Sequence, residues 1–100
     1  MTVDQMIDLL PSYKGKVEID LLLSKSNDYS SNGDILSVFK VVAKELSTTP
    51  ETVIKILIEV KKARLQSLRK KIAVNHESIE DTLTDLGNYE FLLYCSKNEL

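Results

Sequence analysis

The stretch that decides the fold is STTPETVIKILIEVKKARLQSLRKKI, residues 47–72. Its first residues predict the start of a helix, because Thr48 and Glu51 have the spacing of a capping box. Pro50 falls in the first turn, where its missing N–H costs nothing. Apolar side chains then recur at helical spacing as far as Ile72. We therefore expect one long helix from about Glu51 to Ile72.

This expected helix is apolar on two sides when its residues are placed at 100° intervals. The first side carries Ile54, Ile58, Leu65, Leu68 and Ile72. The second side carries Val53, Ile56, Val60 and Ala63. One neighbouring helix does not cover so wide an apolar surface. Either the helix lies at the centre of a bundle, or part of it contacts another subunit, and we expect a homo-oligomer.

The remaining sequence also predicts helices, separated by short breaks. Thr2 and Gln5 form another capping box, and the helix that they open should end before Pro11. Three more helices are expected; they cover about residues 12–26, 35–46 and 76–96.

Two breaks complete this organisation. The segment NDYSSNGD, residues 27–34, is dense in turn-forming residues and predicts a loop. Asn75 is expected to cap the last helix. Residues 1–100 should therefore form a single all-α domain, a compact bundle of four to five helices with a long central helix.

Composition limits the class of protein. The chain has 100 residues, of which 43% are hydrophobic, and a net charge of -2, so it can form a core and has no overall attraction to nucleic acid or anionic membrane. No apolar run approaches the roughly 18 residues that a membrane-spanning helix needs. The N-terminus lacks the basic flank of a signal peptide. We expect a soluble, cytoplasmic protein without a membrane partner.

The last expected helix carries an acidic stripe. Glu77, Asp81 and Asp85 are four residues apart and share one side with Asn88, opposite an apolar side that should pack inward. Carboxylates in this arrangement suit magnesium, which commonly bridges protein carboxylates and substrate phosphates. The alternative is a solvated helix face, with Glu77 and Asp81 favoured near the N-terminus by the helix dipole. The residues of the apolar side are Ile79, Leu83, Leu86 and Leu93.

The long helix supplies the opposite charge. Lys55, Lys62 and Arg69 are seven residues apart and predict an exposed basic edge. Arg64 should lie near the buried side, where its guanidinium can pair with a carboxylate of the last helix. Phosphate binding by Arg64 is the second interpretation.

Two other functions are not expected. Residues 45–57 have the outline of a helix-turn-helix, but the second helix would carry mainly Ile, Val and Leu, and the net charge is negative, so we expect no nucleic-acid partner. Cys95 is the only cysteine, and the only histidine, His76, has no evident route to it. We therefore expect Cys95 to fill apolar space rather than to act as a nucleophile.

Two stretches together resemble the nucleotide modification associated domain 1 family of phage and prophage proteins. KSNDYSSNGDILSVFK, residues 25–40, is similar to the family's Lys-Asn-x-Asp-Tyr loop and the apolar helix after it. KKARLQSLRKKIAVNHESIEDTLTDLGNYEFLLY, residues 61–94, is similar to its Lys-x-x-Arg-Leu helix and its Glu-Ser-x-x-Asp-Thr-Leu-x-Asp-Leu-x-Asn-Tyr helix. The two stretches follow each other in the family's order.

The resemblance implies a site. It assigns a metal, taken as magnesium, to Glu77, Asp81 and Asp85. One departure matters, because the family usually has an acid just before the lysine of its arginine helix and this chain has Val60. The ligand-binding residues that it implies are Asn27, Asp28, Tyr29, Lys61, Arg64, Asn88 and Tyr89.

The resemblance also implies a function. It points to an accessory protein of nucleotide metabolism or DNA-base modification in the host cytoplasm, which binds a nucleoside phosphate. The acidic helix is similar in part to MazG-like all-α nucleotide pyrophosphohydrolases: Glu77 and Glu80 have the Glu-x-x-Glu spacing, but no Glu-x-x-Asp pair follows. Catalysis therefore stays open. The alternative is a non-enzymatic phage interaction protein that oligomerises or engages a host protein.

Overall fold

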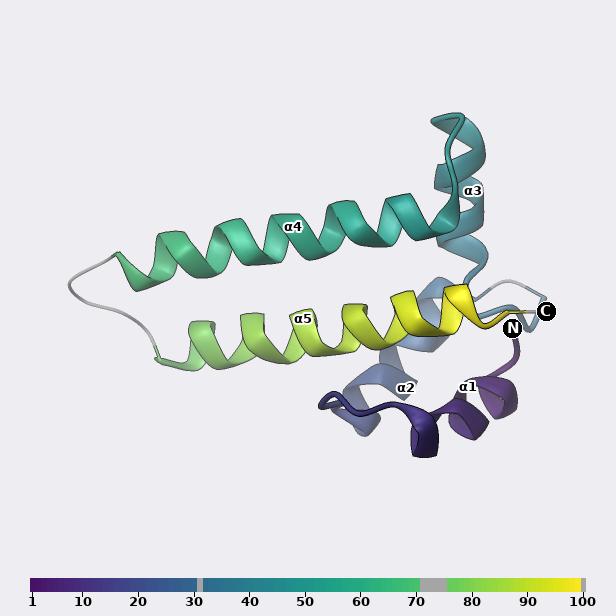
Figure 1. Cartoon of the computed structure of the whole chain (residues 1–100), viewed down its shortest axis with the longest axis horizontal. Helices are drawn as coiled ribbons and strands as arrows, with labels where there is room; N and C mark the ends of the chain where they lie inside the picture. Colours follow the sequence, from purple (N-terminus) through teal and green to yellow (C-terminus); the bar gives the residue numbers. More distant parts are fainter. Residues whose placement is uncertain (31, 71–75, 100) are drawn as a thin grey trace.

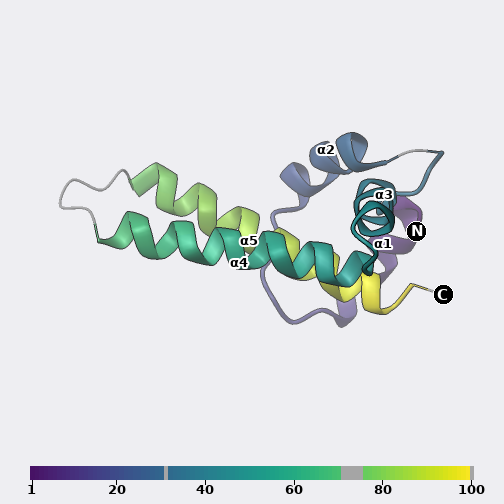
Figure 2. The ribbon, with the colours of Figure 1, turned by 90° about the horizontal axis from the view of Figure 1, so that it is seen from above.

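Helices α4 (Pro50–Arg69) and α5 (His76–Lys97) lie side by side as a long antiparallel hairpin (Figure 1). The computed structural model describes residues 1–30, 32–70 and 76–99, except the side chains of residues 29 and 76–78. The shorter helices gather around one end of the hairpin, and its other end extends away from them (Figure 2). These are α1 (Val3–Leu9), continued by a 3-10 turn (Leu10–Ser12), α2 (Ile19–Tyr29) and α3 (Ser37–Glu45).

The predicted all-α class is confirmed. Five α-helices and one 3-10 turn make up the regular structure of the described residues. The expected long helix is present as α4, with 20 residues, and it packs along α5. The molecule measures 45 × 32 × 22 Å along its principal axes. Among the described helices, none combines the length and the apolar character that crossing a bilayer requires.

The starts of two helices were predicted from capping patterns. At α1, the side chain of Thr2 accepts from the Gln5 N–H and the side chain of Gln5 accepts from the Thr2 N–H, so the first capping box is confirmed. At α4, the predicted capping residue is wrong by one position. Thr49 is the N-cap, and its hydroxyl accepts from the N–H of Thr52 at 3.2 Å. Pro50 occupies the first turn as expected.

The two apolar sides of α4 differ in their surroundings. The first side is confirmed as the inner one: Ile54 is fully buried, and Ile58, Leu65 and Leu68 are at most 9% exposed. Position 72 of that side lies outside the described residues. The second side is only partly buried. Val53 is buried, whereas Ile56, Val60 and Ala63 are exposed.

The apolar core lies where α1, α2 and α3 meet the α4/α5 hairpin. Each of these elements contributes a side chain that is at most 2% exposed. These side chains belong to one cluster, so the short helices are held to the hairpin by apolar burial. They include Met6 of α1, Leu22 of α2, Phe39 of α3, Ile54 of α4 and Phe91 of α5.

The expected second helix starts later than predicted, because residues 13–18 are not helical. Asn88 of α5 holds this segment: its Oδ1 accepts from the Glu18 N–H at 2.9 Å, and its Nδ2 donates to the Glu18 carbonyl at 3.3 Å. Gly87 permits the close approach, since a Cβ there would lie 2.9 Å from the carbonyl oxygen of Lys16. Glu18 is the N-cap of α2, so α5 fixes where α2 begins.

The predicted inner face of α5 is only partly the one that is buried. Leu83, expected inside, is 43% exposed, whereas Asn88, expected on the opposite face, is buried. Leu86 and Leu93 are half-buried against the core. The prediction was wrong because α5 is covered from two sides, by α4 and by the chain that leads into α2.

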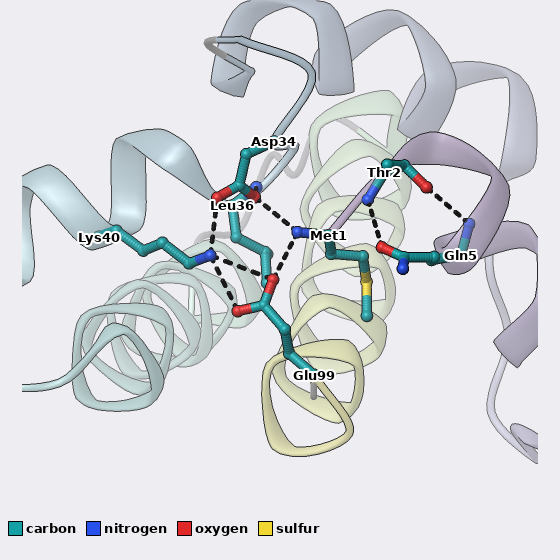
Figure 3. Close-up of polar contacts among 7 residues, drawn as sticks. All are labelled: Met1, Thr2, Gln5, Asp34, Leu36, Lys40 and Glu99. Atoms are coloured by element: carbon teal, nitrogen blue, oxygen red, sulfur yellow. Dashed lines mark hydrogen bonds and ion pairs between the residues drawn. The ribbon is translucent and has the colours of Figure 1, made fainter.

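A network of four charges joins the two ends of the chain to the start of α3 (Figure 3). The Asp34 carboxylate accepts from the Met1 ammonium at 2.9 Å, from Lys40 at 2.6 Å and from the Leu36 N–H at 3.0 Å. Glu99 accepts from the same ammonium and from Lys40. Partial burial works to raise the pKa of Asp34, but these hydrogen bonds outweigh it and hold the pKa at about 2.

Acidification should therefore destabilise the fold through Asp34. A carboxyl whose pKa is lower in the folded state stabilises it above the unfolded pKa, and this contribution disappears as the pH falls through the folded value. We expect about 1–2 kcal/mol to be lost between roughly pH 5 and pH 2. Urea unfolding at a series of pH values measures it. The Asp34→Asn variant should be less stable at neutral pH and show a flatter acid limb; an unchanged limb would contradict this assignment.

Candidate functional site

A pocket of about 410 Å³ opens between the middle of α4 and the first half of α5. Four of the residues predicted for the site line it together: Lys61 and Arg64 from α4, and Asp81 and Asp85 from α5. Helical spacing explains the convergence, because residues three or four apart lie on one side of a helix. Val60 and Thr82 complete the lining.

Asp85 lies at the junction of three helices. One carboxylate oxygen pairs with Lys25 of α2 at 3.0 Å, and the other pairs with Lys61 of α4 at 3.0 Å. Burial works to raise the pKa of Asp85, but the hydrogen bonds from Lys61 and Lys25 outweigh it and lower the pKa below its usual value. The carboxylate thus stays ionised and cross-links α2, α4 and α5.

Removal of this carboxylate should weaken the fold. Asp85→Ala leaves Lys25 and Lys61 facing each other without a counter-charge, and we expect the free energy of unfolding to fall by about 1–3 kcal/mol. Asp81→Ala is the matched control. It removes an exposed carboxylate one turn away that pairs with no described cation, so its effect should stay below about 0.5 kcal/mol. Equal losses in the two variants would show that Asp85 is no cross-link.

Arg64 lies in the pocket but not in the position predicted. The side chain is exposed rather than near the buried side of α4. Within the described part of the chain it forms no ion pair, so the predicted pairing with a carboxylate of the last helix is absent there. Its guanidinium therefore faces the pocket with its donors available to an incoming anion.

Asn88 and Tyr89 serve the packing of α5 rather than the pocket. Asn88 is buried, and its amide is occupied by the backbone of Glu18. Tyr89 is half-buried against the core. With Lys25 and Asp85 they line a separate cavity of only about 10 Å³, the size of about one water molecule. The structure does not bring these two residues to the candidate site.

Three further predicted residues lie at the end of α2. Asn27 and Asp28 are exposed in its last turn, so the expected loop of residues 27–34 begins later than predicted. Neither residue lines the α4/α5 pocket. The backbone of Tyr29 ends α2, and its side chain lies outside the described residues.

The structure describes the side chains of two of the three predicted metal ligands, Asp81 and Asp85. Asp81 is exposed at the pocket, and both oxygens of Asp85 are engaged by lysines. The side chain of Glu77 lies outside the described residues, as does the predicted cap at position 75. Within the described ranges, no three His, Cys, Asp or Glu side chains gather closely enough to hold a metal ion. Of the two predicted ligands whose side chains are described, only Asp81 is not already held by lysines.

Sequence reasoning missed two residues of the site. Lys25 neutralises Asp85 from α2, and Thr82 lines the pocket from α5. The only sequence signal for Lys25 was its place at the start of the KSNDYS stretch. Thr82 carried no helical signal, because the residue after Asp81 lies about 100° around the helix from the acidic stripe.

Cys95 lies in the core and not in the pocket. It is 0% exposed, and burial raises the pKa of its thiol to about 12. The expectation that it fills apolar space is met by its place in the core cluster. A thiol with so high a pKa is almost wholly protonated at neutral pH and is a poor nucleophile.

Cys95 should therefore report on unfolding. We expect a disulfide reagent to modify the native protein at pH 8 far more slowly than the urea-unfolded protein, because the reaction requires an accessible thiolate. Absorbance of the released thiol group measures both rates. Rapid modification of the native protein would contradict the buried position of the side chain.

Comparison with known proteins adds no assignment to this geometry. No protein-family model, no curated protein and no solved structure matches the chain.

Proposed function

We propose that the protein binds a nucleoside phosphate in the pocket between α4 and α5. The observation that carries this proposal is the convergence of Lys61 and Arg64 with Asp81 and Asp85 around one opening. The basic side chains suit a phosphate group, and the acidic ones suit the hydroxyls of a ribose. The resemblance to phage proteins of nucleotide modification motivates the same ligand class.

The phosphate end of the ligand is assigned to Arg64. Its guanidinium presents a planar set of donors that fits two phosphate oxygens at once. No ion pair with a described carboxylate has to be broken for this contact. Lys61 adds positive charge nearby, although Asp85 already binds its ammonium. Arg64 is therefore the principal phosphate ligand, and Lys61 supports it.

The sugar end of the ligand is assigned to Asp81. A carboxylate accepts hydrogen bonds from neighbouring hydroxyls, which is how an acidic residue recognises ribose in dinucleotide-binding proteins. Asp81 is exposed at the pocket, whereas Asp85 already accepts from two lysines. The pocket volume of about 410 Å³ falls within the range usual for small-molecule sites.

Binding is favoured over hydrolysis. A general base that activates water works best when its pKa lies near the operating pH. The pKa of Asp85 is instead lowered by Lys61 and Lys25, so this carboxylate is a weak base at neutral pH. The proposed role is therefore that of a binder or carrier in nucleotide metabolism. Magnesium enters this proposal only as an ion that the phosphates bring with them.

Loss of Arg64 should impair binding selectively. We expect Arg64→Ala to weaken the binding of a nucleoside triphosphate about tenfold or more, because a charge-assisted hydrogen-bond pair is lost. Calorimetric titration with a panel of nucleotides, with and without magnesium, measures it. Arg69→Ala is the matched control, since Arg69 is another exposed arginine of α4 that does not line the pocket. Equal affinities for the two variants, or no binding by the unaltered protein, would rule the proposal out.

The same titrations decide whether the ligand is consumed. Chromatography of the mixture after prolonged incubation should return the nucleotide unchanged. Product formation that requires magnesium and disappears in Asp81→Ala would replace the binding function by a hydrolytic one, with the acidic stripe as its metal site.

The second candidate function is that of a non-enzymatic interaction protein. The observation that favours it is a set of large apolar side chains at the surface of α3 and its C-cap, of which Val41 of α3 and the C-cap Leu46 are 60% and 62% exposed. Exposed apolar patches commonly mark contacts with other proteins. A normal fold without nucleotide binding would favour this function over the first.

A further inference from the structure

The outer side of α4 carries an apolar stripe that no described residue covers. Ile56 and Val60 are 50% and 57% exposed there. Thr52 and Ala63 extend the stripe at its two ends, and Lys55 and Glu59 border it. Together these six residues surround a shallow hollow of about 420 Å³. α5 packs against the opposite side of α4, where Ile54, Ile58 and Leu65 are buried.

We infer that this stripe binds the same stripe of a second copy of the chain, with the two α4 helices antiparallel around a two-fold axis. The axis is level with residue 58. Ile56 of one copy then lies level with Val60 of the other, because the two positions are symmetric about residue 58. Each apolar side chain of the stripe is thereby buried against the other copy.

Charge complementarity selects the antiparallel arrangement. With the axis level with residue 58, Lys55 of one copy and Glu59 of the other lie on the same side of the contact, two residues and therefore about 3 Å apart along the helix direction. A lysine side chain easily spans that offset, so Lys55 of each copy reaches Glu59 of the other, twice in one dimer. A parallel two-fold pair would instead place Lys55 and Glu59 of one copy on the opposite side of the contact from those of the other copy, so the two ion pairs could not form. Antiparallel packing also aligns the helix dipoles favourably.

The size of the side chains fits a helix as the occupant. Thr52 and Ala63 are small, and they lie at the two ends of the stripe on either side of the larger Ile56 and Val60. In the antiparallel register, Thr52 of one copy lies within one residue of the level of Ala63 of the other, so small side chains meet at both ends of the contact and let the two helices approach closely. Because the stripe is complementary to itself in shape and charge, a two-fold contact between identical chains satisfies it without another partner.

The proposed dimer contact does not depend on nucleotide binding, but it lies next to the proposed nucleotide-binding pocket. Val60 belongs both to the outer stripe and to the lining of the α4/α5 pocket. A second copy seated on the stripe therefore forms part of the pocket's wall. The assembly changes the access to Arg64 without changing the fold of either copy.

A charge placed in the stripe should abolish the dimer. We expect sedimentation velocity across a dilution series to show a dimer for the unaltered protein and a monomer for Val60→Glu at every concentration. Val41→Glu is the matched control, because Val41 on α3 is as exposed as Val60 but lies off the stripe, and it should remain a dimer. Circular dichroism checks that both variants keep their helices. A monomeric unaltered protein, or the same dimer in Val60→Glu, would overturn the inference.

Charge exchange tests the direction of packing without altering the apolar contact. Lys55→Glu alone and Glu59→Lys alone should each weaken the dimer, since each places like charges opposite one another. The double variant restores two opposite-charge pairs and should recover the dimer. Recovery supports the antiparallel arrangement; single variants that behave like the unaltered protein, or a double variant weaker than both, would refute it. Nucleotide titration of the same variants keeps this result separate from the ligand-binding proposal.

Discussion

The coverage of α5 from two sides is the constraint on which the rest of the structure depends. α4 packs along one side of α5. On another side, α2 and the segment that leads into it contact α5 through the Lys25–Asp85 ion pair and the Glu18–Asn88 hydrogen bonds. A helix buried in this way cannot confine its polar residues to one solvated face, so some of them lie inside. A buried polar group without a partner costs about 1–3 kcal/mol, and more if it is charged. Asp85 is paired with two lysines, and Asn88 is hydrogen-bonded to the backbone of Glu18, so both have partners.

Because Asp85 binds two lysines, it influences which kind of ligand the neighbouring pocket can bind. Both oxygens of the carboxylate are engaged, so a metal ion would have to displace at least one lysine before it could bind there. An anion meets no such competition at Arg64. Among the residues that line the pocket, the two basic side chains, Lys61 and Arg64, balance the two carboxylates, Asp81 and Asp85. Because both lysines near Asp85 are engaged by that carboxylate, Arg64 is the group through which an incoming phosphate would bind first.

Local signals in the sequence predicted the helices, whereas long-range contacts determined where some of them start. The capping box at Thr2 and the apolar period of α4 were sufficient, because both act within a few residues of the chain. The start of α2 was not predictable in this way. It is fixed by Asn88, 70 residues further along, and by the missing side chain of Gly87. The sequence contains these residues, but no local rule connects them to Glu18.

The candidate site was likewise predicted correctly where local helical spacing decides and incorrectly where contacts between distant helices decide. Lys61, Arg64, Asp81 and Asp85 were identified because they share helix faces and match the resemblance, and the pocket does bring them together. The predicted inner face of α5 was wrong at Leu83 and missed Asn88, because apolar residues lie around much of this helix and its period does not by itself determine which of them are covered. Only the positions of α2 and α4 decide between them. Lys25 was missed for the same reason, since its role exists only after α2 packs against α5.

The two proposed properties of α4 are connected through Val60, which borders both the outer stripe and the pocket. A ligand that fills the pocket contacts a wall whose composition depends on whether a second copy is present. Its affinity for the dimer then differs from its affinity for the monomer, and by linkage the ligand shifts the dimerisation equilibrium by the same factor. A charge introduced at position 60 would therefore act on both proposed properties at once, because it would enter the apolar stripe and the wall of the pocket together.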